Sequence, residues 1–423
     1  MDNTQNTLNT SKINSIEEIT SYLSGMTVKN IKDSATAFGI KCPSMNKNEL
    51  VGWLSGVIYS RQFGEDTTKG FGYKVEFSRV VGLDVSKPRE DRGWLQSLRD
   101  NGVVSIKIED FNPEEYKKNF WGWLSMCNPE VREDNKSSWS LDKVPPSTRG
   151  IFKNYIGHQE WMWTGREKCH SIFKDIWGTD NLLSSFDGAS VIFPPIVKES
   201  SHHLSPPSGL TPPRLGPLSP PSGLTPPRLG PLSLVPLSLP PTTFKNWFHY
   251  DQGRFSFDLS SIQGVVHLTD TNDDDGGFCF IENSHKLHSK YAETHLSWGY
   301  KWEVIDIDHP TFSTCRLIKP RVKAGEILLF DSRIAHCFVP SRSNNYRMVM
   351  YVCMMPRQGA NQKEIEKRQK LYVENSMTGH WCYGPWFDKT DAPYTPGRVQ
   401  IKPPLFSPPV EGLSQLRLSM IGV

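Results

Sequence analysis

The stretch that decides the fold is residues 325–356, which read GEILLFDSRIAHCFVPSRSNNYRMVMYVCMMP. It contains two long apolar runs separated by SRSNN, a cluster of residues typical of turns. Both runs are rich in Val, Ile, Leu, Phe and Met, as buried strands are. Two such runs joined by a short turn predict that the second strand returns antiparallel to the first.

The same pattern of apolar runs separated by turn residues extends back along the chain to residue 256. SFDLSSIQGVVHLTD (256–270) alternates into a buried run and predicts a strand, and FCFIEN (278–283) predicts another. We interpret NDDDGG between them as a hairpin turn, and SHKLHSKYAETH (284–295) as a loop. Many short strands with Gly, Asp and Asn punctuation favour an antiparallel barrel or sandwich.

Helices are predicted before and after these strands. DRGWLQSLRDNGVVSIKI (91–108) predicts a short helix, a turn at Asn101-Gly102 and a strand. The segment after it carries Asn112 as N-cap, Pro113 at the first helical position and two Glu in the first turn. A further helix is expected in NQKEIEKRQKLYVEN (361–375). The predicted class is therefore mainly β with flanking helices.

The composition of the chain argues against several classes of function. The 48 basic and 45 acidic residues give a net charge of +3, which argues against a nucleic-acid coat or a membrane-surface protein. The N-terminus lacks the pattern of a secretory signal, and no apolar run reaches the roughly eighteen residues of a spanning helix. Eight scattered cysteines without a CxxC pair predict a reduced intracellular setting, cytoplasmic or nuclear, without membrane contact.

Composition shifts also divide the chain into predicted regions. We expect a disordered tail at residues 1–14, a small helical domain at 15–60 and a linker at 61–92. One large domain follows at 93–400, with an insertion at 201–243, and a C-terminal tail at 401–423.

The insertion is a proline-rich tandem repeat. LSPPSGLTPPRLGP at 204–217 recurs unchanged at 218–231. From Leu204 to Pro241 no residue is aromatic or acidic, so this segment cannot bury enough surface to offset its ordering entropy. A solvated spacer is the favoured interpretation, and a ligand for an SH3-type groove is the alternative.

Residues 26–58 predict two short amphipathic helices. Thr27 can cap the first, whose apolar face holds Val28, Ile31, Ala35 and Phe38. Gly39 would end it, and a second helix carries Leu50, Val51, Leu54 and Val57. The pair resembles a SAP domain, a DNA-binding unit, over roughly thirty-five residues. Five Lys against five acids in residues 1–60 argue against phosphate binding, so a protein-docking module stays as the alternative to nucleic-acid binding.

The candidate chemistry lies where the chain leaves the insertion. His249 and Asp251 in TFKNWFHYD (243–251) are two apart and would face the same way on a strand. His336 offers a third ligand, and two His with one carboxylate leave open positions on an octahedral ferrous ion. Arg347 follows eleven residues later and, if buried, needs an anion partner. A dicarboxylate co-substrate would supply it.

These segments together resemble a known family. HYD (249–251), GVVHLTDTNDDDGGFCFIENSHKLH (264–288), GEILLFDSRIAH (325–336) and Arg347 resemble the phytanoyl-CoA dioxygenase family of Fe(II)/2-oxoglutarate-dependent oxygenases. The resemblance runs from about Trp94 to His380 and skips the insertion. It implies a double-stranded β-helix, the jelly-roll or cupin-like fold, with iron and 2-oxoglutarate at one end.

The resemblance also implies residue roles. His249, Asp251 and His336 would ligate Fe(II), and Arg347 would bind the distal carboxylate of 2-oxoglutarate. His267 stands where many relatives carry a Trp beside the co-substrate, so it is either a cofactor-binding residue or a core histidine. The NSHKLH segment (283–288) is expected to support the site, with a second metal at His285 and His288 disfavoured.

The implied reaction consumes O2 and 2-oxoglutarate, releases succinate and CO2, and hydroxylates a C–H bond of a small or acyl-type substrate, with ascorbate as a further candidate cofactor. Halogenating relatives replace the metal-binding carboxylate, so Asp251 favours hydroxylation. Two alternatives stay open: a non-catalytic barrel that acts as a scaffold, and an oxygenase directed to nucleic acid by residues 15–60. Arg342 competes with Arg347 for the carboxylate, and Asp306, Asp308 and His309 form a weaker metal candidate.

Overall fold

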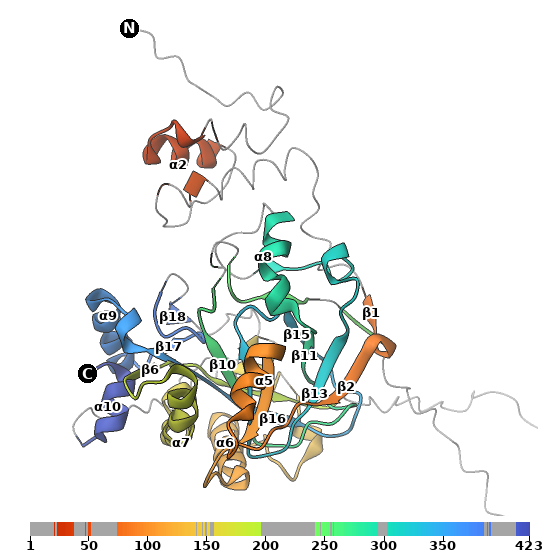
Figure 1. The fold of residues 1–423 in the computed structure, drawn as a ribbon. Coiled ribbons are helices and arrows are strands. Elements are labelled where there is room, and N and C mark those ends of the chain that lie inside the picture. The colour runs from red at the N-terminus through yellow and green to blue at the C-terminus, as the bar shows by residue number, and fades with distance from the viewer. Residues whose placement is uncertain are drawn as a thin grey trace, which may run out of the picture.

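Two β-sheets packed face to face form the body of the protein (Figure 1). The computed structural model describes residues 74–140, 156–195, 258–294, 303–384 and 412–423, and parts of 21–51, 142–152, 242–256 and 387–390. The first sheet has eight strands in the order β3 (Val103–Lys107), β14 (Glu326–Asp331), β10 (Ile262–His267), β16 (Arg347–Pro356), β7 (Ala189–Ile192), β5 (Ile151–Phe152) and β4 (Ser147–Thr148), with β6 (Leu182–Ser184) also paired to β16.

The second sheet has six strands. Their order is β12 (Glu303–Val304), β9 (His249–Tyr250), β15 (His336–Val339), β11 (Gly277–Ile281), β13 (Leu317–Arg321) and β2 (Val80–Asp84). Apart from the parallel pair β2–β13, the pairings in both sheets are antiparallel. The arrangement is the predicted jelly roll, a mainly β domain with flanking helices.

Strand alternation explains how one sequence serves two cores. Val265 and Phe330 point between the sheets, where they pack with Phe278 and Ile318 of the second sheet. Val266, the chain neighbour of Val265, points the opposite way, into the helix layer. Successive side chains of a strand face opposite sides, so the buried run of β10 contributes to both cores at once.

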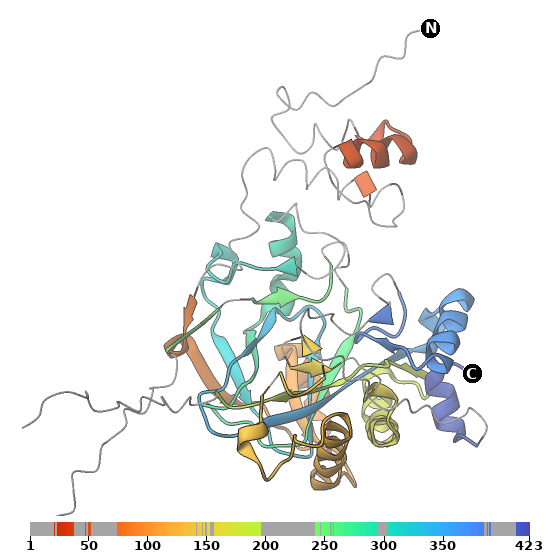
Figure 2. The ribbon, with the colours of Figure 1, turned by 180° about the vertical axis from the view of Figure 1, so that it is seen from behind.

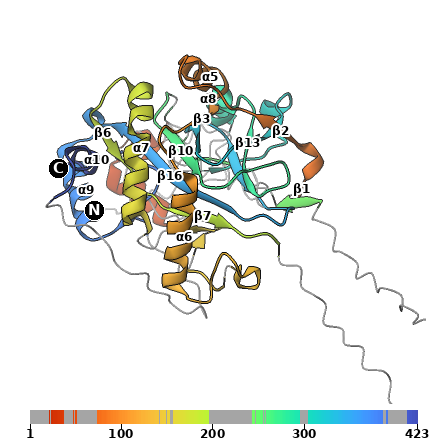
Figure 3. The same ribbon diagram turned by 90° about the horizontal axis from the view of Figure 1, so that it is seen from below.

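Helices cover the outer face of the eight-stranded sheet, as Figure 3 shows for α6 and α7 beside β16 and β7. Aromatic and aliphatic side chains of this layer pack against Met348 and Met350 of β16. The layer contains α5 (Gly93–Asn101), α6 (Pro113–Cys127), α7 (Glu160–Trp177), α9 (Gln362–Val373) and α10 (Gln415–Ile421). The outer face of the six-stranded sheet packs with α8 (Ser284–Thr294).

The predicted helix starts are confirmed. The Asn112 side chain accepts a hydrogen bond from the Glu114 amide at 3.2 Å, with Pro113 beginning α6. Asn361 and Glu364 form a reciprocal capping box at the start of α9. Gly102, at φ 71°, ends α5 in the left-handed conformation and leads directly into β3.

The predicted linker at 61–92 is wrong for the part that the structure describes. β2 pairs in parallel with β13, and β1 (Lys74–Glu76) pairs with β8 (Thr243–Lys245). The oxygenase-like domain therefore begins before residue 93. The prediction failed because β1 carries Lys74 and Glu76 on its exposed side, and because β2, which reads VVGLD, pairs with a strand far away in the chain. Residues 61–73 lie outside the described residues.

Two further expectations need correction. NDDDGG is not a hairpin turn, because β10 and β11 on either side of it belong to different sheets. Its carboxylates are bound locally: Asp273 pairs with Arg321, and Asp275 accepts hydrogen bonds from Ser343 and Asn345. Residues 284–294 form α8 rather than a loop, since Ser284, His288 and Ala292 share a buried face with period four.

The C-terminal tail predicted at 401–423 is also wrong where it is described. Met420 and Ile421 of α10 are fully buried, and α10 packs beside α9, as the view from behind in Figure 2 shows at the C-terminus. Short 3-10 turns complete the fold at η2 (Phe77–Arg79), η3 (Lys136–Ser138), η4 (Ile156–His158), η5 (Pro310–Phe312) and η6 (Arg357–Gly359), and a small pair joins β17 (Met377–Thr378) to β18 (Lys389–Thr390).

Only part of the N-terminal region can be compared with its prediction. The first helix is α2 (Val28–Ala37), and the Thr27 hydroxyl accepts from the Asn30 amide at 3.2 Å, as expected of its cap. Ile31 is buried, but Val28 is exposed. Gly39, most of the second helix, the disordered tail and the proline-rich repeat lie outside the described residues. Among the described helices, none has the length and apolar character needed to cross a bilayer.

A buried arginine ties the C-terminal elements to the sheet. Arg368 of α9 donates hydrogen bonds to backbone carbonyls of Ser184, Met420, Ile421 and Cys382, at 2.6–3.1 Å. Burial lowers the pKa of Arg368 to about 10, so it stays charged at neutral pH. One side chain therefore holds together β6, α10 and the segment that follows β17.

We predict that Arg368→Met destabilises the protein by about 3 kcal/mol, because several buried carbonyls lose their donor together. The urea midpoint of unfolding measures this. Lys370→Met on the same helix is the matched control, since the Lys370 side chain is 75% exposed. Equal midpoints for the two variants would contradict the anchoring role.

Candidate functional site

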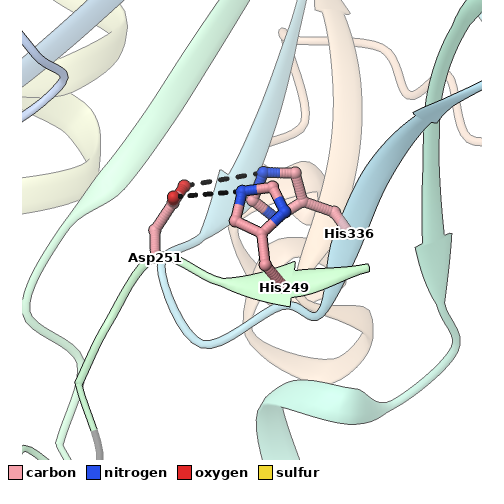
Figure 4. Close-up of side chains that lie close together, drawn as sticks. All are labelled: His249, Asp251 and His336. Carbon is pink, nitrogen blue, oxygen red and sulfur yellow. Dashed lines mark ion pairs between the residues drawn. The ribbon is translucent and has the colours of Figure 1, made fainter. Parts of the chain in front are cut away.

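The three predicted metal ligands lie together at one end of the six-stranded sheet. His249 on β9 is the direct cross-strand partner of His336 on β15, with ring centroids 4.4 Å apart. Asp251 follows β9 immediately, and Figure 4 shows its carboxylate facing both imidazoles. The strand register therefore brings together residues that are 85 or more positions apart in the chain.

The three ligand atoms converge on one point. His249 Nε2 lies 3.4 Å from Asp251 Oδ1, and His336 Nε2 lies 3.5 Å from Asp251 Oδ2. One ligand atom from each of the three residues falls within 4.8 Å of the others. All three residues are at most 9% exposed. This is the geometry of a facial metal-binding triad.

Backbone contacts set the tautomers of both imidazoles. His249 Nδ1 lies 3.2 Å from the Trp247 carbonyl, and His336 Nδ1 lies 3.0 Å from the Ile334 carbonyl. A carbonyl only accepts, so each Nδ1 carries the proton and each Nε2 directs a lone pair toward Asp251. Burial lowers the pKa of His336 to about 4, which keeps it neutral at pH 7. Two lone pairs and a carboxylate facing one point call for a cation.

Polar neighbours fix the Asp251 carboxylate. Gln263 of β10 donates its amide N–H to Oδ2 at 3.0 Å, and His380 Nε2 lies 3.6 Å from the same oxygen. Burial alone would raise the pKa of Asp251, but the surrounding histidines lower it well below its usual range. The carboxylate is therefore ionised, and the amide of Gln263 sets its orientation, as outer partners of metal ligands do.

Arg347 lies at the start of β16, facing the same interior. It is 1% exposed, and burial lowers its pKa to about 10, so it is cationic. Its Nη2 approaches His267 Nε2 at 3.4 Å, and the Tyr351 side chain is a further partner. Nε and Nη1 are buried without a hydrogen-bond partner among the described residues. A buried guanidinium with two unused donors fits a carboxylate.

A cavity of about 190 Å³ joins these groups. Trp247 and Phe338 form its outer wall, and Phe278 and Phe330 form part of its inner wall. Its polar and charged lining residues are Asp187, His249, Asp251, Gln263, His336, Arg347, Tyr351 and His380. The candidate ligands and the candidate carboxylate clamp therefore face one cavity.

Comparison with known proteins agrees with this geometry. Residues 240–349, which contain all three candidate ligands and Arg347, match the model of the family described as phytanoyl-CoA dioxygenase. The resemblance to this family that the sequence predicted is confirmed over these residues. The enzyme class expected from the sequence, a non-haem 2-oxoglutarate-dependent oxygenase, is the class of this family.

Individual relatives are distant. The chain is 21% identical over 350 residues to Ava biosynthesis cluster protein O of Aspergillus versicolor, covering 74% of this chain and 94% of that protein. Among solved structures, the carbocyclase SnoK from nogalamycin biosynthesis is 13% identical with a TM-score of 0.37 over 67% of this chain and 87% of its own. HygX of Streptomyces hygroscopicus, with nickel and 2-oxoglutarate, is 12% identical with a TM-score of 0.36 over 63% and 87%.

His267 contacts Arg347 through its Nε2 atom. It is 1% exposed and does not line the cavity. Burial lowers its pKa well below the usual range, so it is neutral. Because Arg347 can only donate, His267 Nε2 accepts, and its Nδ1 lies 3.1 Å from the Thr271 hydroxyl. Of the two predicted roles, the geometry favours a core histidine that orients Arg347.

The alternative candidates for the carboxylate clamp and for a metal site have other partners. Arg342 pairs with Asp274 and its guanidinium covers the Phe77 ring at 4.5 Å. Asp308 pairs with Arg79 on the surface, and His309 Nδ1 accepts from the Thr311 amide as a helix cap. His285 and His288 each approach a different backbone carbonyl, of Arg99 and Gln252. The described part of the chain holds one histidine-carboxylate cluster, that of His249, Asp251 and His336.

The segment 283–288 supports the site, as expected. The Ser284 hydroxyl donates to the Ile281 carbonyl at 2.7 Å and accepts from the Ala335 amide at 2.9 Å. The Tyr250 hydroxyl donates to the Ser284 carbonyl at 3.1 Å. These bonds join the start of α8 to both ligand-bearing strands.

Four cavity residues were missed from the sequence. Gln263 and Tyr351 carry a usable signal, because each is a polar residue at an inward position of a buried strand, four residues from His267 and from Arg347. Asp187 precedes β7, and His380 lies beyond α9. No local pattern connects these last two residues to the triad, because only tertiary packing brings them to the cavity.

We predict that Gln263→Leu weakens binding of Fe(II) or Ni(II) to the protein by roughly 10- to 100-fold, because the Asp251 carboxylate loses its orienting amide. Anaerobic calorimetric titration of the full chain measures the affinity. Gln362→Leu on the exposed face of α9 is the control and should match the unmodified protein. A folded Gln263 variant with unchanged affinity would argue against this role.

Proposed function

We propose that this protein is an Fe(II)- and 2-oxoglutarate-dependent dioxygenase that hydroxylates a C–H bond of a small-molecule substrate. One substrate C–H, one O2 and one 2-oxoglutarate would give the alcohol, succinate and CO2. The observation that carries the proposal is the coexistence, in one cavity, of a His-Asp-His triad with a buried arginine whose Nε and Nη1 have no hydrogen-bond partner in the described structure.

The residues present fit the proposed cofactors. His249, Asp251 and His336 would hold the iron through two neutral imidazoles and one carboxylate. Arg347 would bind the distal carboxylate of 2-oxoglutarate with its unused donors, and Tyr351 beside it would restrict the guanidinium. Bound iron, together with 2-oxoglutarate and O2, supplies the oxidising power for the hydroxylation.

The chain's own residues contribute positioning and exclusion of water. Gln263 donates a hydrogen bond to the Asp251 carboxylate, and the strand pair β9–β15 fixes both imidazoles. Phe278 and Phe330 pack on the His336 ring at 5.2 Å and 4.9 Å between centroids. These apolar contacts keep bulk water from the inner side of the site and hold the reacting groups in one geometry.

Two observations support hydroxylation of a small molecule. Asp251 supports hydroxylation, since a carboxylate at this position occupies a coordination place that a halide would need. The name of the Aspergillus versicolor relative places that protein in a biosynthesis cluster, which supports a small-molecule substrate here. The alternative of a non-catalytic barrel is disfavoured because a buried His-Asp-His-Arg set has a desolvation cost without a compensating role.

We predict that His249→Ala abolishes 2-oxoglutarate-dependent succinate release, because the metal loses one of its two imidazoles. Succinate is measured by coupled assay or mass spectrometry with Fe(II) and O2 present. His170→Ala removes a buried histidine of α7 outside the cavity and serves as the control. Turnover unaffected by His249→Ala would refute the proposed function.

Arg347→Gln should raise the KM for 2-oxoglutarate by roughly 10- to 100-fold, as expected for loss of a buried charge-assisted pair. Arg342→Gln, five residues earlier, should leave the KM unchanged because Arg342 is held by Asp274 and Phe77. Succinate release measured against 2-oxoglutarate concentration gives both values. A larger effect from Arg342→Gln would assign the clamp to that residue instead.

A further inference from the structure

The triad cavity adjoins a second pocket, which we call the aromatic vestibule. It has a volume of about 340 Å³, and its walls include Trp139, Ile192, Phe193, Trp247 and Phe338. Trp247 and Phe338 line both spaces. The vestibule therefore adjoins the proposed site across these two boundary aromatics.

The vestibule walls present hydrocarbon and ring faces. Among its described lining residues, Ser140 is the single polar side chain and none is charged. The indole N–H of Trp139 already donates to the Arg132 carbonyl at 3.0 Å, and that of Trp247 donates to the Phe338 carbonyl at 2.9 Å. With these donors used, the walls favour an apolar ligand.

Ring contacts hold these walls in place. Trp139 stacks on Phe193 with centroids 6.1 Å apart and meets Tyr346 edge-on at 5.0 Å. Trp247 stacks on the His249 ring at 5.0 Å, and the Arg347 guanidinium covers the Phe338 ring at 5.1 Å. Two proposed site residues thus position the boundary aromatics, which supports a preformed route to the metal.

The inner cavity carries one more charge. Asp187 is 5% exposed and lines the cavity beside Tyr351. Its Oδ1 accepts from the Gly188 amide at 2.7 Å, its backbone carbonyl accepts from Nη2 of the buried Arg166 at 2.9 Å, and the Arg166 charge attracts the carboxylate. Once iron takes the triad and 2-oxoglutarate takes Arg347, the remaining charge facing a substrate is this carboxylate. It repels anions and accepts a hydrogen bond from a hydroxyl or an amine.

We propose that the vestibule binds the body of a neutral or cationic, predominantly apolar small-molecule substrate, and that Asp187 discriminates against acids. This inference rests on the proposed function, because the bound molecule is a substrate only if the protein is an oxygenase. An acyl thioester of coenzyme A does not suit this lining, because its phosphates require cationic partners. The acyl-type substrate considered from the sequence is therefore the disfavoured class.

A matched pair of fluorescent probes tests the charge preference. N-phenyl-1-naphthylamine is neutral, and 8-anilinonaphthalene-1-sulfonate has the same ring system with one added sulfonate. Titrated into the full chain with Ni(II) and 2-oxoglutarate present, so that the triad and Arg347 are occupied, the neutral probe should bind about tenfold tighter or better, or ~1.4 kcal/mol at 25 °C. Equal affinities, or tighter binding of the sulfonate at the exposed Lys136 beside Trp139, would overturn the proposal.

Variants locate the probe. Ile192→Asp places a charge on the vestibule wall and should weaken the neutral probe about tenfold. Phe193→Ala removes wall area without charge and should weaken it several-fold. Met126→Asp, at a 59% exposed position on α6, is the charge control and should have no effect. Circular dichroism verifies that each variant is folded, and unchanged binding by both folded vestibule variants would place the probe elsewhere.

Asp187→Asn tests the discrimination itself. Sulfonate affinity should rise several-fold while neutral-probe affinity stays the same. No gain for the sulfonate would remove Asp187 from the proposal. Succinate release with 2-oxoglutarate alone tests the proposed function in parallel, so failure of the oxygenase and failure of the vestibule proposal give different results.

Discussion

His249 and His336 face each other across the antiparallel pair β9–β15, and this register determines what the rest of the site can do. A slip of one residue would turn either imidazole to the opposite face of the sheet and separate it from Asp251. The carbonyls of Trp247 and Ile334 each bind Nδ1, so both lone pairs point inward. Geometry and protonation are thus set by the same two short strands.

Buried charge is the second constraint. The interior between the sheets is apolar, yet it encloses Arg347, Asp251 and Asp187. The structure offsets part of this cost with fixed dipoles: Gln263 on Asp251, Gly188 on Asp187, and His267 with Tyr351 on Arg347. Arg368 shows the fully satisfied version of the same device, with four backbone carbonyls around one guanidinium. Nε and Nη1 of Arg347, which have no hydrogen-bond partner among the described residues, are therefore available to a ligand.

Sequence reasoning succeeded where local rules decide the structure. Asn112 and Pro113 mark the start of α6 by capping chemistry, and the spacing of His249 and Asp251 brings both to one point, although Asp251 follows the end of β9. It failed where long-range pairing decides. Residues 80–84 join a sheet because β13 lies beside them, and NDDDGG crosses between sheets instead of closing a hairpin. Asp187 and His380 reach the cavity through packing that no local pattern encodes.

The pairing of early strands with late ones has a consequence for synthesis. β2 pairs with β13, and β3 pairs with β14, so Val80 meets Leu317 and Val103 meets Phe330. Both strands leave the ribosome long before their partners exist, and their backbone donors stay open during that interval. Non-local pairing of this kind folds slowly, and an open strand edge invites pairing with other chains. Recombinant production should therefore respond to slow translation at low temperature and to chaperones that shield strand edges.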